Sequence, residues 1–248
     1  MPERLVAPAK VTLSLRVTGV RPDGFHLIDA EMVTIDLHDV LEVDPLRTGS
    51  PAELVVHGPE GRRPTDPEDL VLRALARTGR SARVHLHKRI PAGAGLGGGS
   101  ADAAAILRWA AREDTSALDP DGAAALGADV PFCVVGGRAR VRGIGEQVDP
   151  LPHVDAELTL VTPPLHCSTP VVYRMWDELG APTGEHGNDL EPAALAAYPE
   201  LAGFRDRLAE ETGCPPRLAG SGSTWFVEGA HPGPGRTVVR TVAPDGPV

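Results

Sequence analysis

The chain has 248 residues, 42% of them hydrophobic, and a formal net charge of −10. This length allows one or two domains with a substantial core, and the negative charge argues against a nucleic-acid backbone as partner. The three cysteines, Cys133, Cys167 and Cys214, show neither metal-binding nor disulfide spacing, which favours a reducing, cytoplasmic setting. The sequence starts without a signal-peptide pattern and contains no apolar run long enough to cross a membrane, so we expect no membrane partner.

Strands dominate the beginning of the chain. An alternating apolar pattern begins at Lys10, just after Pro8, and a turn at 21–24 leads into further extended segments. The predicted strands cover residues 10–17, 25–37, 40–43 and 53–56. A helix over 66–76, capped by Asp66, is predicted next. These patterns indicate an antiparallel set of strands ahead of the first long helix.

A glycine-rich segment follows a predicted strand at 82–87 and leads into a predicted helix at 103–112. Its glycines leave backbone N–H groups free to turn toward an anion, Ser100 stands where an N-cap belongs, and the helix start offers a positive dipole. Strand, loop and helix together predict a phosphate site. The candidate residues are Pro91, Ala92, Gly93, Ala94, Gly95, Leu96, Gly97, Gly98, Gly99, Ser100 and Ala101.

Other interpretations of this segment fit less well. Residues 93–98 match the dinucleotide pattern G-x-G-x-x-G, but the turn-like segment 113–122 stands where a second strand should follow. The Walker pattern requires a lysine directly after its last glycine, and no lysine follows the glycines here. A flexible glycine loop that binds nothing is the remaining alternative.

Only two of the 24 basic residues are lysines, Lys10 and Lys88. In a chain that otherwise uses arginine, each is a candidate for a role that requires lysine, and an ordinary surface charge is the alternative. Asp102 is expected to complement the helix dipole rather than to bind a ligand.

The second half of the chain alternates between helices and strands. We expect a helix at 119–126 ended by Gly127, two short strands around Gly136-Gly137, a hinge at 149–152 and a strand at 157–162. We also expect helices at 169–179 and 199–211 and a helix start at 188–192. A second glycine-rich loop is expected at 218–223, and a short strand at 237–242 in a loose C-terminal end.

Three segments occur in a fixed order along the chain: Pro8-Ala-Lys10, the loop at 91–100, and Leu218-Ala-Gly-Ser-Gly-Ser223. In this order they resemble the GHMP small-molecule kinases. Further matching stretches lie at 21–26, 34–37, 126–132, 143–146, 168–173 and 188–192. The resemblance is closest to the branch of that family that acts on a cytidine-diphosphate-linked methylerythritol in non-mevalonate isoprenoid synthesis.

The resemblance implies an α/β (α+β) fold with two domains and the active site in the cleft between them. A ribosomal-protein-S5-like domain would cover residues 1–152, and a ferredoxin-like domain residues 153–248. The resemblance also implies an enzyme that uses ATP and Mg²⁺ to phosphorylate the 2-hydroxyl of a small substrate with a cytidine diphosphate group. A monomer and a homodimer both stay open.

The resemblance assigns the chemistry to two residues. Asp129 would accept the proton of the attacking hydroxyl, while Lys10 would keep Asp129 ionised and neutralise developing charge. Ser100 would contact Mg²⁺. Taken alone, Asp129 could be a turn residue and Lys10 an edge-strand charge. Two functional alternatives remain: a GHMP kinase for another small alcohol, and a non-catalytic nucleotide-binding relative, which would be marked by loss of Lys10 or Asp129.

The resemblance also implies a site for the cytosine ring. Phe25 and Tyr173 would sandwich the ring and His26 would bind its polar edge, although both aromatics could instead be core residues. Two residues after its lysine the family usually carries asparagine, and this chain has Thr12 at that position. The remaining implied substrate contacts are Thr12, Gly220, Ser221 and Gly222.

Overall fold

The fold is built on two long antiparallel strands, β1 (Glu3–Val20) and β2 (His26–Pro45). The computed structural model describes residues 2–58, 61–63, 66, 68–244 and 246. The two strands predicted at 25–37 and 40–43 are one strand, because His38 and Asp39 stay paired with β1. Lys10 lies in the middle of β1, not at its start, directly after a break in the register with β2.

Within the described residues, the first sheet has seven strands in the order β4-β3-β5-β2-β6-β7, with β1 paired to β2 off this path. The added strands are β3 (Glu53–Gly58), β4 (Gly61–Arg63), β5 (Ala82–His87), β6 (Arg138–Gly143) and β7 (Gln147–Leu151). The hinge predicted at 149–152 is wrong over most of its length, because Asp149 to Leu151 pair with β6.

In the part of the chain that the structure describes, four α-helices and a 3₁₀ turn connect these strands: α1 (Leu70–Arg77), α2 (Gly98–Ala110), η1 (Thr115–Leu118), α3 (Pro120–Leu126) and α4 (Val130–Val135). Asp69, not Asp66, caps α1, since its carboxylate accepts from the Val71 N–H at 2.8 Å. Residue 67 of the predicted helix lies outside the described residues. The strand predicted just before Gly136 is helix α4, because Pro131 fits a first helical turn and the short apolar run is buried among helices.

Among the residues that the structure describes, the second sheet has four strands in the order β11-β8-β10-β9. Its strands are β8 (Glu157–Val161), β9 (Arg217–Leu218), β10 (Trp225–Glu228) and β11 (Thr237–Arg240), and the helices between them are α5 (Thr169–Glu178), α6 (Glu191–Ala197) and α7 (Leu201–Thr212). After β11 the chain is not loose, because the Val242 N–H donates to the Thr34 carbonyl oxygen at 2.9 Å. Residues 245, 247 and 248 of that predicted loose end lie outside the described part.

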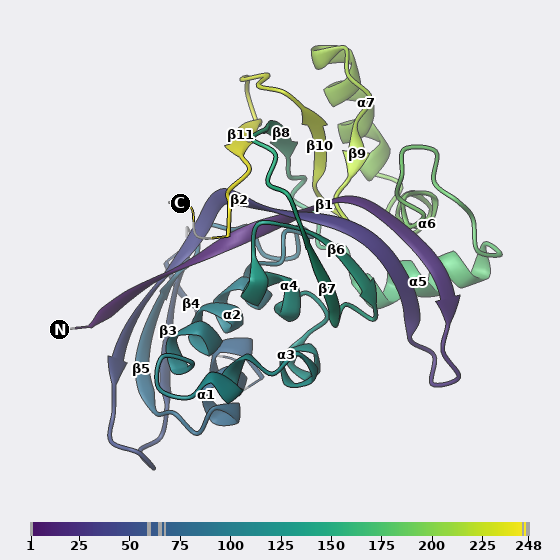
Figure 1. The fold of residues 1–248 in the computed structure, drawn as a ribbon. Coiled ribbons are helices and arrows are strands. Elements are labelled where there is room, and N and C mark those ends of the chain that lie inside the picture. Colours follow the sequence, from purple (N-terminus) through teal and green to yellow (C-terminus); the bar gives the residue numbers. More distant parts are fainter. Residues whose placement is uncertain (1, 59–60, 64–65, 67, 245, 247–248) are drawn as a thin grey trace.

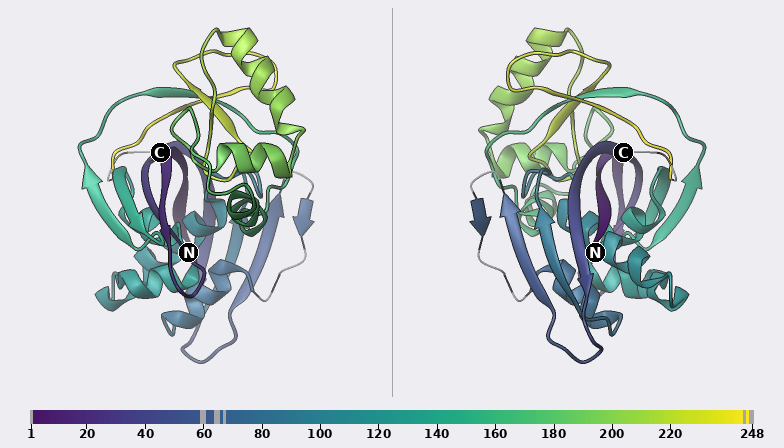
Figure 2. Two further views of the ribbon diagram at one scale, coloured as in Figure 1. Left: turned by 90° about the vertical axis from the view of Figure 1, so that its right-hand side faces the viewer. Right: turned by 90° about the vertical axis from the view of Figure 1, so that its left-hand side faces the viewer.

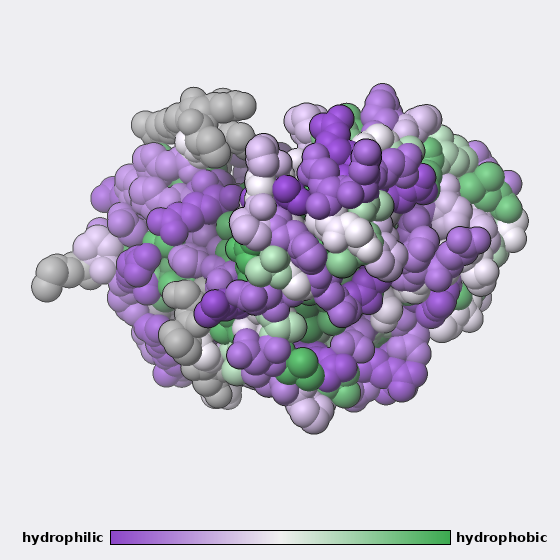
Figure 3. Space-filling view, turned by 90° about the horizontal axis from the view of Figure 1, so that it is seen from above, coloured by the Kyte–Doolittle hydropathy of each residue, from purple (hydrophilic) through white to green (hydrophobic). Residues whose placement is uncertain are grey.

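The two long strands run across the whole molecule, with α1–α4 below them and β8–β11 above in the view of Figure 1. Figure 2 shows the same layers from both sides. Seen from above, the surface is mainly hydrophilic, with small scattered hydrophobic patches (Figure 3). Within the described chain, no helix is long and apolar enough to span a membrane. The α/β class is confirmed, and the domain division at residue 152 stays a prediction.

A compact apolar cluster lies between the two sheets. It joins Val11 and Ile35 of the long strands to Leu160 and Phe226 of the second sheet, and it also contains Leu96 from the glycine-rich segment. Burial of Leu96, which is 1% exposed, anchors the glycine loop to both sheets.

Candidate active site

The glycine loop is pinned on both sides by backbone contacts. The Lys10 N–H donates to the Leu96 carbonyl oxygen at 3.0 Å, and the Thr224 N–H donates to the Ala94 carbonyl oxygen at 3.1 Å. A Cβ added to Gly95 would lie 2.6 Å from the Gly222 carbonyl oxygen. Glycine is therefore required at residue 95 for the two glycine-rich loops to pack against each other.

Helix α2 begins within the glycines. Its N-cap is Gly97 in the left-handed conformation (φ 69°), and no side chain caps the helix. The prediction of Ser100 as N-cap is wrong, because the chain becomes helical at Gly98 and places Ser100 in the first turn. The N–H groups of this first turn have no intrahelical acceptor, so they suit an anion.

Lys10 and Asp129 lie together next to this loop. The Lys10 Nζ is 3.2 Å from Asp129 Oδ2, and it donates to Thr12 Oγ1 at 3.1 Å. The side chain of Lys10 is 6% exposed and that of Asp129 30% exposed, so one partner is buried while the other reaches the surface. Asp129 is the N-cap residue of helix α4, but its side chain makes no capping hydrogen bond. The structure thus brings together Lys10 and Asp129, to which catalytic roles were assigned, and Thr12, an implied substrate contact, and all three roles stay predictions.

The second glycine-rich loop adjoins the same pair. A Cβ at Gly220 would lie 3.6 Å from Thr12 Oγ1 and 3.8 Å from Lys10 Nζ. Ser221 Oγ is 2.9 Å from Thr169 Oγ1. The buried amide of Asn188 donates to the carbonyl oxygens of Leu218 and Gly220, at 2.9 and 2.7 Å. We did not predict this role for Asn188, which the sequence indicated only as part of a helix start.

The predicted base-binding residues fall into two groups. The rings of His26 and Tyr173 stack with centroids 4.5 Å apart and planes at 29°, and His26 Nε2 is 2.9 Å from Asp177 Oδ1. Phe25 stands apart at the tip of the β1–β2 hairpin, 57% exposed. Burial, with a smaller effect of Asp129, raises the pKa of the Tyr173 hydroxyl. The cytosine sandwich stays a prediction.

Comparison with known proteins identifies the family. The family described as GHMP kinases N terminal domain matches residues 69–137. A protein of Cereibacter sphaeroides named 4-diphosphocytidyl-2-C-methyl-D-erythritol kinase is 42% identical over 89% of this chain and 87% of its own. A protein of the same name from Dinoroseobacter shibae is 41% identical over 89% of this chain and 83% of its own. The chain belongs to the 4-diphosphocytidyl-2-C-methyl-D-erythritol kinase family of GHMP kinases.

The fold agrees with this membership. A crystal structure of 4-(cytidine 5'-diphospho)-2C-methyl-D-erythritol kinase is 31% identical and superposes with a TM-score of 0.75, covering 96% of this chain and 99% of that one. The GHMP kinase fold predicted from the sequence is therefore confirmed. GHMP kinases are ATP-dependent phosphotransferases of small molecules, so ATP is implied for this member.

The other lysine of this kinase lies in a buried ion cluster that we did not predict. Lys88 Nζ is 2.5 Å from Asp39 Oδ2 and 2.7 Å from Asp102 Oδ2. Asp102 does not merely complement the helix dipole, since its side chain is 3% exposed and faces the lysine. Burial raises the pKa of Asp102 to about 7. The attraction of Lys88 lowers this pKa, and repulsion from Asp39 and Asp69 raises it further, so the net shift is upward. Burial acts to lower the pKa of Lys88, but the two carboxylates outweigh it and raise that pKa.

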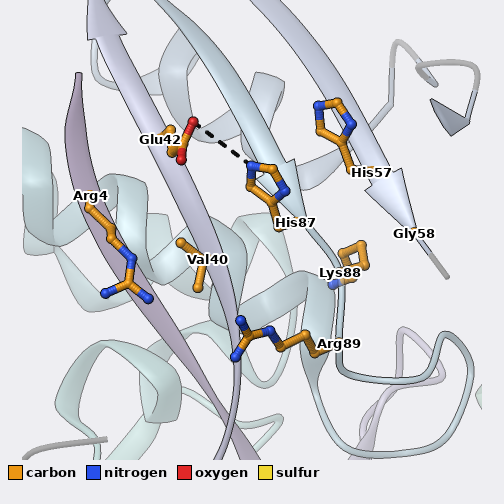
Figure 4. Close-up of a pocket in the computed structure, with 8 residues that line it drawn as sticks. All are labelled: Arg4, Val40, Glu42, His57, Gly58, His87, Lys88 and Arg89. Atoms are coloured by element: carbon orange, nitrogen blue, oxygen red, sulfur yellow. Dashed lines mark ion pairs between the residues drawn. The ribbon is translucent and has the colours of Figure 1, made fainter. Parts of the chain in front are cut away.

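A pocket of about 450 Å³ lies on the sheet beside the start of the glycine loop (Figure 4). It is lined by Arg4, Val40, Glu42, His57, Gly58, His87, Lys88 and Arg89. Figure 4 shows Arg4 and Arg89 on either side of Val40, and neither guanidinium has a carboxylate partner within the described residues. None of the predicted site residues of the kinase lines this pocket, so the pocket is not part of the predicted catalytic site.

Proposed function

We propose that this chain transfers the γ-phosphoryl group of ATP to the 2-hydroxyl of 4-diphosphocytidyl-2-C-methyl-D-erythritol, a step toward isoprenoid precursors outside the mevalonate route. The observation that carries the proposal is the Lys10–Asp129 pair, 3.2 Å apart and hydrogen-bonded through Lys10 to the glycine loop. Relatives named for this reaction are about 40% identical over most of the chain.

The glycine loop is the proposed cradle for the triphosphate. Its N–H groups and the positive end of the α2 dipole favour a polyanion. The chain has a net charge of −10, so the local cations matter for attracting a nucleotide. Arg4 and Arg89, beside the start of the loop, supply such charge.

The residues present fit a Mg²⁺ ion that arrives with the triphosphate. Within the described residues, no group of three or more His, Cys, Asp or Glu side chains could hold a metal on its own. Mg²⁺ at such sites usually takes one or two protein oxygens and fills its other positions with phosphate oxygens and water. Ser100, with its hydroxyl in the uncapped first turn of α2, would supply one such oxygen. When bound, the ion would neutralise phosphate charge.

The proton of the acceptor would pass to Asp129. As the 2-hydroxyl oxygen forms its bond to the γ-phosphorus, the bond to the β,γ-bridging oxygen breaks, and ADP leaves with that electron pair. The carboxylate of Asp129 takes the hydroxyl proton, and the ammonium of Lys10 keeps the carboxylate ionised beforehand and offsets charge on the transferring group. The 30% exposure of Asp129 leaves it open to a substrate.

The cytidine end of the acceptor would bind at the β1–β2 hairpin and α5. Phe25 and Tyr173 would sandwich the base, and His26, whose ring stacks on Tyr173, would bind its polar edge. The contacts of Thr12 and the second loop would then place the methylerythritol part near Lys10. A cytoplasmic location and a monomeric or homodimeric state stay predictions.

The test is turnover by the purified chain with ATP, Mg²⁺ and 4-diphosphocytidyl-2-C-methyl-D-erythritol, followed by ADP release and by mass spectrometry of the product. Mevalonate and homoserine serve as control acceptors. We expect phosphorylation of the cytidyl substrate alone. Turnover of a control acceptor in its place would indicate a GHMP kinase for another alcohol, and nucleotide binding without any turnover would indicate a non-catalytic relative.

A further inference from the structure

The ion cluster of Lys88, Asp39 and Asp102 joins three elements at the base of the glycine loop. Asp39 lies on β2, Lys88 directly follows β5, and Asp102 lies in helix α2. The side chains are 0%, 15% and 3% exposed. The cluster therefore connects the sheet to both ends of the loop through charges that are almost removed from water.

Asp39 holds the start of the loop with both of its oxygens. One oxygen pairs with Lys88, and the other accepts from the backbone N–H groups of Arg89 and Ile90. The three charge-assisted hydrogen bonds that this buried carboxylate accepts leave this part of the backbone little freedom. The conformation of the chain just before Pro91 is thus set by Asp39.

Lys88 extends this restraint to the far end of the loop. Its ammonium reaches Asp102 in α2, and a Cβ at Gly98 would lie 3.2 Å from Lys88 Nζ and 3.0 Å from Ile90 Cγ2. The first turn of α2 therefore packs directly against the lysine. In contrast to Lys10, no hydrogen bond or ion pair within the described residues links Lys88 to Asp129.

A buried ion cluster is a poor way to gain stability, because the desolvation of its charges offsets their attraction. Its benefit is a defined geometry, since each oxygen and N–H requires its partner at one distance and direction. That geometry is needed where backbone N–H groups must converge on one anion.

We infer that Lys88, Asp39 and Asp102 are positioning residues that hold the glycine loop in its triphosphate-binding conformation. The inference rests on the proposed function of the loop as the ATP cradle. It differs from a purely structural role in one consequence. Loss of the cluster should weaken ATP binding selectively, while the acceptor site on the hairpin and α5 stays intact.

The test compares Lys88→Met with the parent and with Glu31→Gln, a control that removes the Arg138–Glu31 ion pair between β6 and β2. Calorimetry with a non-hydrolysable ATP analogue gives Kd, and steady-state assays give both KM values, all well below each melting temperature. We expect Kd and KM for ATP to rise at least about tenfold in Lys88→Met, with KM for the acceptor within about twofold of the parent. Glu31→Gln should leave all three constants unchanged.

An unchanged Kd for the analogue in Lys88→Met, or an equal rise in both KM values, would overturn the inference. If Lys88→Met does not fold, Asp39→Asn and Asp102→Asn are measured in the same way, and unchanged Kd values in both overturn it. The binding measurement needs no acceptor. If the parent chain binds the analogue but phosphorylates nothing, the proposed function is refuted. The Kd values of the variants would still decide the inference.

Discussion

The backbone N–H of Lys10 donates a 3.0 Å hydrogen bond to the carbonyl oxygen of Leu96, which ties the proposed catalytic strand directly to the proposed phosphate loop. Leu96 is itself 1% exposed. The backbone of Lys10 is therefore held directly against the loop, and a change in either should affect the other.

Gly97→Val should abolish most ATP affinity. Residue 97 has φ 69°, and a Cβ there would lie 2.9 Å from Lys10 Cγ, so valine both strains the backbone and displaces the lysine stem. Calorimetry with an ATP analogue measures the loss. Gly79→Val is the matched control, because that glycine also has a positive φ (63°) but open space around it. It should cost about 1 kcal/mol of stability through backbone strain and leave ATP affinity intact. Parental affinity in Gly97→Val would remove this loop as the phosphate cradle.

Tyr173→Ala should raise KM for the cytidyl substrate by about tenfold or more, since stacking of an aromatic side chain on a base contributes ~1–3 kcal/mol. The ring also supports His26, with which it stacks at 4.5 Å. KM for ATP should barely change. Tyr173→Phe keeps the ring and should behave like the parent. An equal loss for both substrates, or no loss for either, would count against base recognition at this residue.

Asp129→Asn should lower kcat by about 10²–10⁴-fold with binding preserved, because it keeps the shape and removes the proton acceptor. Lys10→Met should also lower kcat, and the double variant should lose less than the sum of the two, since residues 3.2 Å apart act as one unit. Lys10→Arg should not restore activity, because a planar guanidinium does not fit the place of a compact ammonium. Single-turnover phosphoryl transfer measures all four, and a near-parental rate for Asp129→Asn would exclude it as the base.

Asp102→Asn should make the unfolding free energy less dependent on pH. Burial raises the pKa of Asp102 from 3.8 to about 7. The folded chain therefore holds this proton more tightly than the unfolded chain, and its contribution to stability is complete below about pH 4 and lost as the pH rises through 7. Lys88, Asp39 and Asp69 are the charged groups that act on it. Between pH 5 and pH 8, denaturant titrations should show the variant gaining roughly 2 kcal/mol relative to the parent. A constant difference across this range would show that Asp102 is already ionised at pH 5.

Several local features of this chain could be predicted from the sequence because short-range rules decide them. The glycine loop between strand 82–87 and a helix could be predicted because its glycines leave the backbone N–H groups uncovered. Before the loop, apolar and polar residues alternate strictly, as in a strand. The helix over Thr169–Glu178 follows in the same way from Pro170 in its first turn. Where two local rules competed, the sequence was misleading. Ser100 is a good cap by type, but the glycines before it become helical first, and Gly97 caps the helix instead.

Only the tertiary structure decided which charged residues meet. Lys88 is 49 positions from Asp39 and 14 from Asp102, and the register of β2 with β5 brings all three together. Lys88 could be singled out as one of two lysines, but no spacing rule predicts a partner across a sheet, because strand order and register depend on the whole core. The same reason applies to Asn188, whose amide reaches carbonyl oxygens 30 and 32 positions away. Composition thus indicated which residues to examine, and the packing of the two sheets determined what they contact.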